Sequence, residues 1–457
     1  MKLFKYLKKI TAICVITAAV LTAVVFVCPK EVSAGRMDLV YIQFSLDGGT
    51  PFTVPAYEGS YPGNLFVSMR ELSKALSGTV FQYGFYNDAD GVFHIDTGIP
   101  YDASLEPEEQ KDENDEVIKY EKPQIGYQFR LANWTLFNGR DVNYYTYADY
   151  GDEDMYMSTL DIQMLFDVKI EYANGVYNIL SGEKFSVDLN ELDANGHFDY
   201  LHSVLLGDAT TGEIIYANNE DIPVPIASTT KLMTYLLVER MIEIGKISPD
   251  DMVTISADAA RISTSDDAVI YMYEGLQTTV DELLKAMIIQ SSNESAQALG
   301  EYVAGGSSEK FVEMMNDMAF RLGLETAVFY NSHGLPTFTA GSVVTMVENK
   351  MSARDMFKLA RTILLKYPQI EEISSLKSAW LDILWTNVVT NNSLMYNMDD
   401  VFGMKTGTTD AAGKCLVAAR RVQIEGEEHI LVAMVFGAEE NIDRFGIPEL
   451  LLKSQGY

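Results

Sequence analysis

The sequence has 457 residues, which is too many for one ordinary domain and enough for two or three, each with its own core. Hydrophobic residues make up 47% of it and charged residues 22%, a balance that excludes a largely disordered chain and a membrane protein with many spans. With 65 acidic against 34 basic residues the net charge is −31. Such a surface would repel phosphates, so nucleic-acid binding is not expected, and the function must be sought in a local site.

The first 34 residues have the pattern of an export signal. Four lysines, at positions 2, 5, 8 and 9, precede an uncharged apolar run from Ile10 to Cys28, and small residues follow at Val32-Ser33-Ala34. This order predicts a signal peptide over residues 1–34. The run of 19 residues also approaches the ~20 that span a bilayer, so a retained N-terminal anchor is the alternative. Both predict an exported protein.

Cysteine and histidine positions indicate neither a disulfide nor a metal site. Cys14 and Cys28 belong to the signal, and Cys415 lies in an apolar stretch where we expect a small buried hydrophobe, not a nucleophile. His197 and His202 share a segment but lack the cysteines, paired carboxylates or second pair that a metal site needs. No metal or other cofactor is predicted.

Residues 35–195 are rich in tyrosine and in short alternating runs, which predicts a β-rich α+β domain. Ser68-Met69-Arg70-Glu71 and Ser158-Thr159-Leu160-Asp161 both fit the capping box and should each open a short helix. They lie 90 residues apart, so we expect two strand-helix-strand units, separated by an acidic insertion at 102–116. The pattern resembles the N-terminal domain of copper amine oxidases, an accessory module of exported bacterial proteins. No copper is implied, because no ligand cluster is present.

Residues 196–457 have a different character, with helical periodicity between strand-like ends. The predicted elements are strands at 203–206, 213–216, 414–422 and 430–437 and helices at 231–247, 280–303, 308–322, 352–365 and 447–453. Strands at both ends with helices between them predict one antiparallel sheet assembled from the two ends and covered by helices.

The pattern Ser-x-x-Lys places a serine and a lysine on one helix face, about 5–6 Å apart at Cβ, so that the lysine can activate the serine. It begins at Ser181, Ser228, Ser307 and Ser374. Only Ser228 follows an extended segment with two prolines and precedes a strong apolar helix. At such a helix N-terminus the backbone N–H groups favour a developing anion. Ser181 is expected in a turn, and Ser307 is expected to be an ordinary helix cap.

Two further motifs follow in order, each occurring once. Ser291-Ser292-Asn293 ends an apolar helix, and Lys405-Thr406-Gly407 ends a strand-like segment. Together with Ser228-x-x-Lys231 they form the triple of penicillin-binding proteins and serine β-lactamases.

Residues 196–457 resemble the catalytic domain of the low-molecular-weight penicillin-binding proteins, the serine-type D-alanyl-D-alanine carboxypeptidases of peptidase family S11. The resemblance implies a β-lactamase/transpeptidase-like α+β fold, preceded here by the smaller β-rich domain. It implies two kinds of ligand, peptidoglycan stem peptides ending in D-Ala-D-Ala and β-lactam antibiotics. It also implies an extracytoplasmic location, at the cell wall or the outer face of the membrane. The segments that carry it are 225–234, 290–296, 331–335, 352–356 and 403–409.

The resemblance assigns catalytic roles to the first two motifs. Ser228 would attack the carbonyl between the two D-alanines, with Lys231 as its base. Ser291 would pass the proton to the leaving D-alanine, and Asn293 would bind both substrate and Lys231. Lys231 must be neutral for this, so burial and the charge of Lys405 should lower its pKa.

The third motif supplies the expected substrate-binding residues, Lys405, Thr406, Gly407 and Thr408. Lys405 and Thr406 would face the substrate carboxylate. The N–H groups of Ser228 and Thr408 would form the oxyanion hole.

This sequence departs from the family pattern at three positions. Ser292 stands where many relatives have glycine, Ser332 stands where the family usually has proline, and Asn391 lies near a position where some relatives carry an arginine for the carboxylate. His333 is expected to be structural and not catalytic, because of its Gly-Leu turn context.

Two rival functions remain open. A serine β-lactamase would share the three motifs, but the Glu-x-x-Leu-Asn element that positions the deacylating water in class A enzymes is missing. A non-catalytic wall-binding relative would keep the fold and use the N-terminal domain. The intact motifs argue against it.

Overall fold

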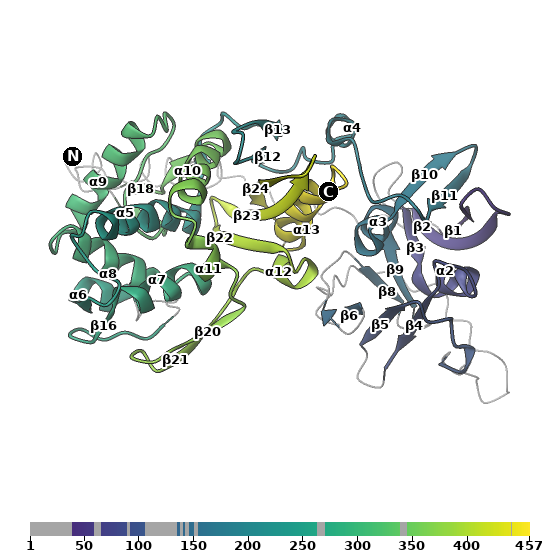
Figure 1. The fold of residues 1–457 in the computed structure, drawn as a ribbon, viewed down its shortest axis with the longest axis horizontal. Coiled ribbons are helices and arrows are strands. Elements are labelled where there is room, and N and C mark those ends of the chain that lie inside the picture. The colour runs from purple at the N-terminus through teal and green to yellow at the C-terminus, as the bar shows by residue number, and fades with distance from the viewer. Residues whose placement is uncertain are drawn as a thin grey trace, which may run out of the picture.

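The computed structural model describes residues 39–58, 65–88, 92–105, 135–137, 140–141, 146–149, 154–262, 270–338, 345–439 and 441–457. The predicted signal segment and nearly all of the predicted acidic insertion lie outside these residues. Figure 1 shows a layer of helices at one end, a β-rich N-terminal region at the other, and a five-stranded sheet between them. Within the described residues, no helix combines the length and apolarity needed to cross a membrane.

The N-terminal region contains a seven-stranded sheet in the order β10-β11-β1-β2-β3-β9-β8 and a four-stranded sheet in the order β4-β5-β6-β7. Its helices are α2 (Met69–Leu76), α3 (Thr159–Phe166) and α4 (Leu189–Ala194), with a short 3-10 turn, η1 (Ala103–Leu105). Its strands are β1 (Leu39–Leu46), β2 (Phe52–Glu58), β3 (Leu65–Ser68), β4 (Tyr83–Asn87), β5 (Phe93–Thr97), β6 (Thr135–Phe137), β7 (Arg140–Asp141), β8 (Thr146–Asp149), β9 (Asp154–Ser158), β10 (Lys169–Ala173) and β11 (Val176–Leu180).

Both predicted capping serines are confirmed. Ser68 Oγ accepts a hydrogen bond from Glu71 N and Ser158 Oγ accepts one from Asp161 N, each at 3.0 Å. Helices α2 and α3 follow the two serines directly, and the strands that precede them, β3 and β9, pair with each other in antiparallel fashion. Strands also pair across the two halves, because β1 is parallel to β11 and β5 is parallel to β6. The two halves of the N-terminal region are therefore interleaved within shared sheets.

The rest of the chain is built on an antiparallel sheet in the order β13-β12-β24-β23-β22, which brings the two ends of the segment together as predicted. Its strands are β12 (Ser203–Asp208), β13 (Ile214–Asn218), β22 (Val401–Thr409), β23 (Gly413–Ile424) and β24 (Glu427–Ala438). Alternate residues of β24 enter two different cores, since strand side chains point to opposite faces in turn. Val432 and Met434 join the core beneath the helical layer. Ala433 and Val435 join a second core.

The second core continues into the N-terminal region. It contains residues of the seven-stranded sheet, such as Phe44 and Ile179, together with Leu450 and Leu451 of the last helix, α13. Lys453 on α13 also donates a hydrogen bond of 2.8 Å to the carbonyl of Met164 on α3. The five-stranded sheet is thus covered by helices on one face and by α13 with the N-terminal region on the other.

Helices between the strands form the other layer. They are η2 (Ala227–Thr230), α5 (Lys231–Glu243), α6 (Ala257–Ile262), α7 (Val280–Ile289), α8 (Asn293–Val303), α9 (Ser308–Arg321), α10 (Ala353–Lys366) and α11 (Ile370–Ser374). The short α12 (Leu394–Asn397) and the last helix, α13 (Asn441–Lys453), contribute instead to the second core. Short strands join them: β14 (Val224–Pro225), β15 (Met252–Thr254), β16 (Gln277–Thr279), β17 (Thr337–Phe338), β18 (Met346–Val347), β19 (Lys350–Met351), β20 (Ser378–Leu381) and β21 (Thr386–Val389).

The prediction of one helix over 280–303 is wrong. The chain forms two helices, α7 and α8, separated at residues 290–292. Ser291 has a φ of +68°, a left-handed conformation that an α-helix does not accommodate. Ser292 then caps α8, because its Oγ accepts a hydrogen bond of 3.0 Å from Ser295 N. The apolar periodicity continues across the break and hides it from a pattern-based analysis.

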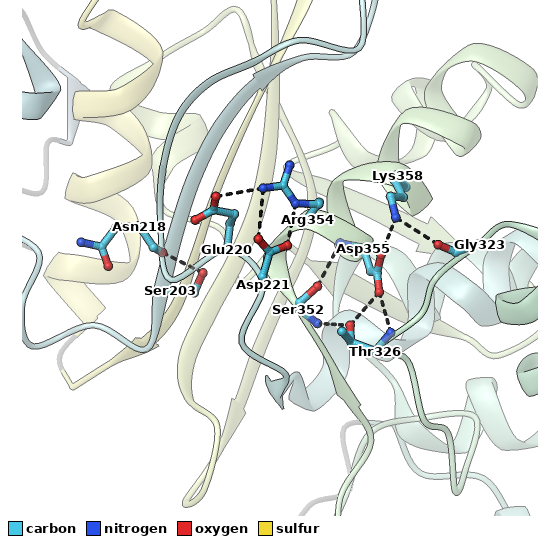
Figure 2. A network of polar contacts seen from close by, with 10 residues as sticks. All are labelled: Ser203, Asn218, Glu220, Asp221, Gly323, Thr326, Ser352, Arg354, Asp355 and Lys358. Carbon is cyan, nitrogen blue, oxygen red and sulfur yellow. Dashed lines mark hydrogen bonds and ion pairs between the residues drawn. The ribbon is translucent and has the colours of Figure 1, made fainter.

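A polar network at the start of α10 joins three distant segments (Figure 2). Asp355 is 3% exposed, and its Oδ2 accepts hydrogen bonds from the N and Oγ1 of Thr326 at 2.7 and 2.6 Å. Its Oδ1 accepts one of 2.8 Å from Lys358 Nζ. The neighbouring Arg354 forms ion pairs with Glu220 and Asp221 at 2.9 and 2.6 Å, near the solvent.

We expect Asp355→Asn to lower the urea unfolding midpoint clearly and Arg354→Gln to leave it nearly unchanged. Asp355 holds charge-assisted hydrogen bonds in a buried position, and losing such bonds costs about 1.5–3 kcal/mol each. The Arg354 side chain is 38% exposed and Asp221 is 69% exposed, and exposed pairs contribute about 0–1 kcal/mol. Equal shifts in the two variants would contradict this ranking.

Candidate active site

The site begins where an extended segment turns into a helix. Ser228 lies in the 3-10 turn η2, directly before α5, and Lys231 is the first residue of that helix. Ala227, just before the serine, has a φ of +45°, which is rare and costly for a residue other than glycine. Thr229 Oγ1 donates a hydrogen bond of 2.6 Å to the carbonyl of Ile226 and helps to hold the turn.

Lys231 is the centre of the site and is fully buried. Its Nζ lies 2.7 Å from Ser228 Oγ, 2.7 Å from Asn293 Oδ1 and 2.8 Å from the carbonyl oxygen of His333. The amide and carbonyl oxygens can only accept hydrogen bonds, whereas the serine hydroxyl can also donate. A neutral lysine therefore donates to Asn293 and His333 and keeps its lone pair for the proton of Ser228.

The electrostatics favour that neutral form. Burial lowers the pKa of Lys231 well below its ordinary value, and the positive charge of Lys405 lowers it further. Glu294 acts in the opposite direction but more weakly. Lys231 thus has the position and the lowered pKa that a general base needs.

The second motif occupies the break between α7 and α8. Asn293 is the first residue of α8 and reaches Lys231, and Ser291 shares its turn. Without the break, the three residues would continue one helix. The positive φ of Ser291 is therefore part of how the fold brings Asn293 to the base.

The third motif lies on β22, which is an edge strand of the five-stranded sheet. A Cβ on Gly407 would come within 3.0 Å of Ser228 N and 3.1 Å of Ala227 Cβ, so a larger residue would push this strand away from the nucleophile's backbone. Lys405 Nζ donates a hydrogen bond of 2.9 Å to the carbonyl of Thr406. Burial and, next, the charge of Arg444 lower the pKa of Lys405 to about 7.

The other Ser-x-x-Lys serines lie elsewhere. Ser307 Oγ accepts a hydrogen bond from Lys310 N at 3.2 Å and caps α9, as predicted. Ser181 lies in a turn and donates a hydrogen bond of 2.6 Å to Asp47 Oδ2. Neither contacts a lysine in the manner of Ser228.

Residues 200–440 match a protein-family model described as D-alanyl-D-alanine carboxypeptidase, peptidase family S11. The chain belongs to this family. The matched residues include all three motifs of the site and exclude nearly all of the N-terminal region.

Known carboxypeptidases of the family are similar over part of their length. DacD of Escherichia coli K12 is 36% identical over 269 residues, which are 58% of this chain and 64% of that protein. DacF of Bacillus subtilis 168 is 34% identical over 248 residues, 53% of this chain and 58% of that protein. The chain therefore spans about three fifths of the length of these curated relatives.

A solved structure gives the same fold. The peptidoglycan synthesis regulatory factor PBP3 from Streptococcus pneumoniae superposes with a TM-score of 0.50 and 31% identity, covering 55% of this chain and 72% of that chain. The carboxypeptidase-family part of the chain has the penicillin-binding-protein, transpeptidase-like α+β fold, and the β-rich N-terminal region is additional to it.

The family member described here replaces two expected residues without loss of local structure. Ser292, where many relatives have glycine, caps α8 and also donates a hydrogen bond of 2.7 Å to Glu294 Oε2. Ser332, where proline is usual, places its carbonyl 2.6 Å from Thr234 Oγ1, which donates to it. Both substitutions therefore add or keep polar contacts around the site.

Sequence reasoning missed Arg444 in this member of the family. Its Nη1 donates a hydrogen bond of 2.9 Å to Thr408 Oγ1 and lies 3.5 Å from the carbonyl of Gly407. Burial lowers the pKa of Arg444 to about 10. It lies on α13, far along the chain from the third motif, and no spacing rule connects the two.

Asn391, which lies near the position where some relatives carry an arginine, donates a hydrogen bond of 3.2 Å to the carbonyl of Gln290.

His333 contributes its backbone to the site and keeps its ring neutral. Its Nδ1 accepts a hydrogen bond of 3.1 Å from Leu335 N. Burial is the main cause that lowers its pKa to about 3, and the charge of Lys231 adds to this effect when that lysine is protonated. Cys415 is buried, as expected, and burial raises its thiol pKa to about 12. No group of His, Cys, Asp and Glu in the described parts of the chain could hold a metal ion.

Proposed function

We propose that the chain is a serine-type carboxypeptidase that removes the terminal D-alanine from peptidoglycan stem peptides ending in D-Ala-D-Ala. The observation that carries the proposal is the buried Lys231, held within 2.8 Å of Ser228, Asn293 and the carbonyl of His333. Membership of the carboxypeptidase family supports the choice of substrate.

Acylation would begin with attack of Ser228 Oγ on the carbonyl between the two D-alanines. The hydroxyl proton passes to Lys231 Nζ as the new C–O bond forms. The N–H groups of Ser228 and Thr408 stabilise the oxyanion, since the glycine at 407 lets β22 lie close to the serine backbone. Collapse breaks the C–N bond, and the departing amine takes a proton from Lys231 through Ser291.

Deacylation repeats these steps with water as the nucleophile. Lys231 accepts a proton from water, hydroxide adds to the ester carbonyl, and Ser228 leaves with a proton. The products are a shortened stem peptide and free D-alanine. Lys405 and Thr406 hold the terminal carboxylate. Arg444 helps to position β22, because it donates a hydrogen bond to Thr408 Oγ1.

Penicillins would acylate Ser228 by the same attack, because their strained amide carbonyl occupies the position of the D-Ala-D-Ala carbonyl.

We place the enzyme outside the cytoplasm, at the cell wall or the outer face of the membrane, because residues 1–34 have the pattern of an export signal. We divide the rest into an accessory domain, 35–195, similar to the N-terminal domain of copper amine oxidases, and a catalytic domain, 196–457. The interleaved halves of the first and the start of the family match at residue 200 support this division.

The test is the mass of the intact protein against time after addition of benzylpenicillin, for the protein and its Ser228→Ala variant. We expect a slowly decaying adduct on the parent alone, together with D-alanine release from an N-acylated L-Lys-D-Ala-D-Ala peptide. An adduct that vanishes within seconds, with rapid hydrolysis of the drug, would instead identify a β-lactamase. A folded parent without any adduct would overturn the assignment of Ser228 and favour a non-catalytic wall-binding role.

A further inference from the structure

A short hairpin, β20–β21, carries two of the three tryptophans of the sequence and projects from the helical layer (Figure 1). Its two faces differ. Leu381 and Val388 are at most 1% exposed and pack inward, whereas Trp380 is 51% exposed and Trp385, in the connecting turn, is 78% exposed. Exposed large aromatic side chains gathered at one place mark an interaction surface more often than single apolar residues do.

The two indole rings form one platform. Their centroids are 5.3 Å apart and the ring planes meet at 79°, an edge-to-face arrangement. Trp385 has a φ of +49°, which is uncommon for so large a residue and needs support from its surroundings. We call Trp380 and Trp385 together the tryptophan platform.

That support comes from a buried carboxylate. Glu282 on α7 is 7% exposed, and its two oxygens accept hydrogen bonds from Ile383 N at 2.7 Å and Leu384 N at 3.1 Å. The turn that presents Trp385 is thus fixed from below by a charged group. A platform held in one conformation loses little conformational entropy when a ligand binds.

The base of the hairpin adjoins the proposed active site. Val389 N donates a hydrogen bond of 3.3 Å to Gln290 Oε1, and Asn391 Nδ2 donates one of 3.2 Å to the carbonyl of Gln290. Gln290 directly precedes Ser291 of the second motif. Trp380 pairs with Asn387, two positions beyond the Ser378–Val389 pair, so it lies about 7 Å farther along the strand.

This spacing suits a substrate that is attached to a polymer. In peptidoglycan the bond to be cleaved follows the fourth residue of the stem, and the first residue is joined to a sugar. Four extended residues span about 13 Å, so the sugar would lie about that far from the bond to be cleaved. A hairpin that starts beside the second motif and carries Trp380 about 7 Å farther out is near enough to meet it. A ring of a polysaccharide offers flat C–H faces, which pack on the negative face of an indole.

We propose that the tryptophan platform binds the glycan strand that carries the stem peptide, and so directs the enzyme to polymeric peptidoglycan. This inference rests on the proposed carboxypeptidase function. The net charge of −31 favours an uncharged sugar surface over an anionic membrane as the occupant, because acidic proteins are repelled by anionic lipid headgroups.

The test compares Trp380→Ala/Trp385→Ala with Trp380→Phe/Trp385→Phe, which keeps two rings. Phe320→Ala is the matched control, since Phe320 is 84% exposed on α9, away from the hairpin in Figure 1. Three measurements are made: binding to uncharged glycan strands of linked N-acetylglucosamine, D-alanine release from pentapeptide-rich sacculi, and D-alanine release from a soluble acylated tripeptide.

We expect the double alanine variant to bind glycan strands about tenfold more weakly, a loss of about 1.4 kcal/mol. Its KM on sacculi should rise in parallel, with kcat and the soluble-peptide activity unchanged, and the double phenylalanine variant should lie between it and the parent. The proposal would be overturned if the double alanine variant bound glycan strands as well as the parent does. It would also be overturned if that variant lost binding to vesicles of anionic lipid and kept its binding to glycan strands. A parent that neither cleaves the soluble peptide nor reacts with benzylpenicillin would mean that the proposed function itself has failed.

Discussion

Gly334→Ala is expected to lower the rate of acylation by benzylpenicillin about a hundredfold, the effect of displacing a reacting group by ~1 Å. Gly334 has a φ of +94°, and a Cβ there would overlap the carbonyl of Ala227 and come within 3.0 Å of Ser228 N. Because neighbouring backbone cannot move aside as a flexible side chain can, either the nucleophile or the His333 carbonyl that holds Lys231 must shift. The measurement is the second-order acylation rate by mass spectrometry.

Gly306→Ala is the matched control. Gly306 has nearly the same φ, +96°, but a Cβ there meets nothing within 4 Å. Both variants carry the penalty of a left-handed alanine, about 1 kcal/mol, so only the steric effect at the site differs between them. Similar acylation rates in the two variants would show that Gly334 does not hold the nucleophile in place.

Lys231→Arg is expected to reduce acylation and D-alanine release about a thousandfold, within the range for loss of a general base. Unlike the neutral lysine, arginine stays positively charged and cannot give up its proton, so it cannot accept the proton of Ser228. Lys310→Arg, in the Ser-x-x-Lys pattern that only caps α9, should behave like the parent. If Lys231→Arg folds, as judged by circular dichroism, and keeps its activity, Lys231 is not the base.

The pH dependence follows from the same two lysines. Activity should rise with pH as Lys231 loses its proton, at a pH well below the ordinary lysine pKa. It should fall again as Lys405, with a pKa of about 7 in the free enzyme, loses the charge that binds the carboxylate. A bound carboxylate raises the pKa of Lys405, so the alkaline limb of kcat should lie at higher pH than that of kcat/KM. Coincident limbs would contradict this role.

Local signals in the sequence predicted much of the fold. The capping serines at 68 and 158 and the neighbouring strands predicted at 203–206 and 213–216 all formed, because short-range hydrogen bonds and turn conformations determine them. The helix predicted over 280–303 missed the break at residues 290–292, because apolar periodicity runs through it, although the second motif was itself expected to end an apolar helix. Periodicity reports the buried face of a helix and not its continuity.

Parallel pairing between distant strands of the N-terminal region could not be predicted. Nothing in the sequence indicates that β1 pairs with β11 or β5 with β6, since parallel pairing between distant strands leaves no local pattern. In the candidate site, the first two motifs gave Ser228 and Asn293, each in contact with Lys231. Arg444 and the His333 carbonyl reach the site only through the tertiary fold, so no local pattern predicts them. The His333 contact is also made by a backbone carbonyl, which every residue has.

Strand β24 has a consequence for how the molecule opens. It is paired on both edges, by β12 and β23, and its side chains enter a core on each face. Its amide protons can exchange with solvent only when the whole sheet separates, so they should be among the slowest to exchange in the protein. Strand β22, which carries Lys405 and Thr408, is joined through β23 to β24. Strand β22 can therefore separate locally from the sheet while the pairing of β24 with its two neighbours stays intact.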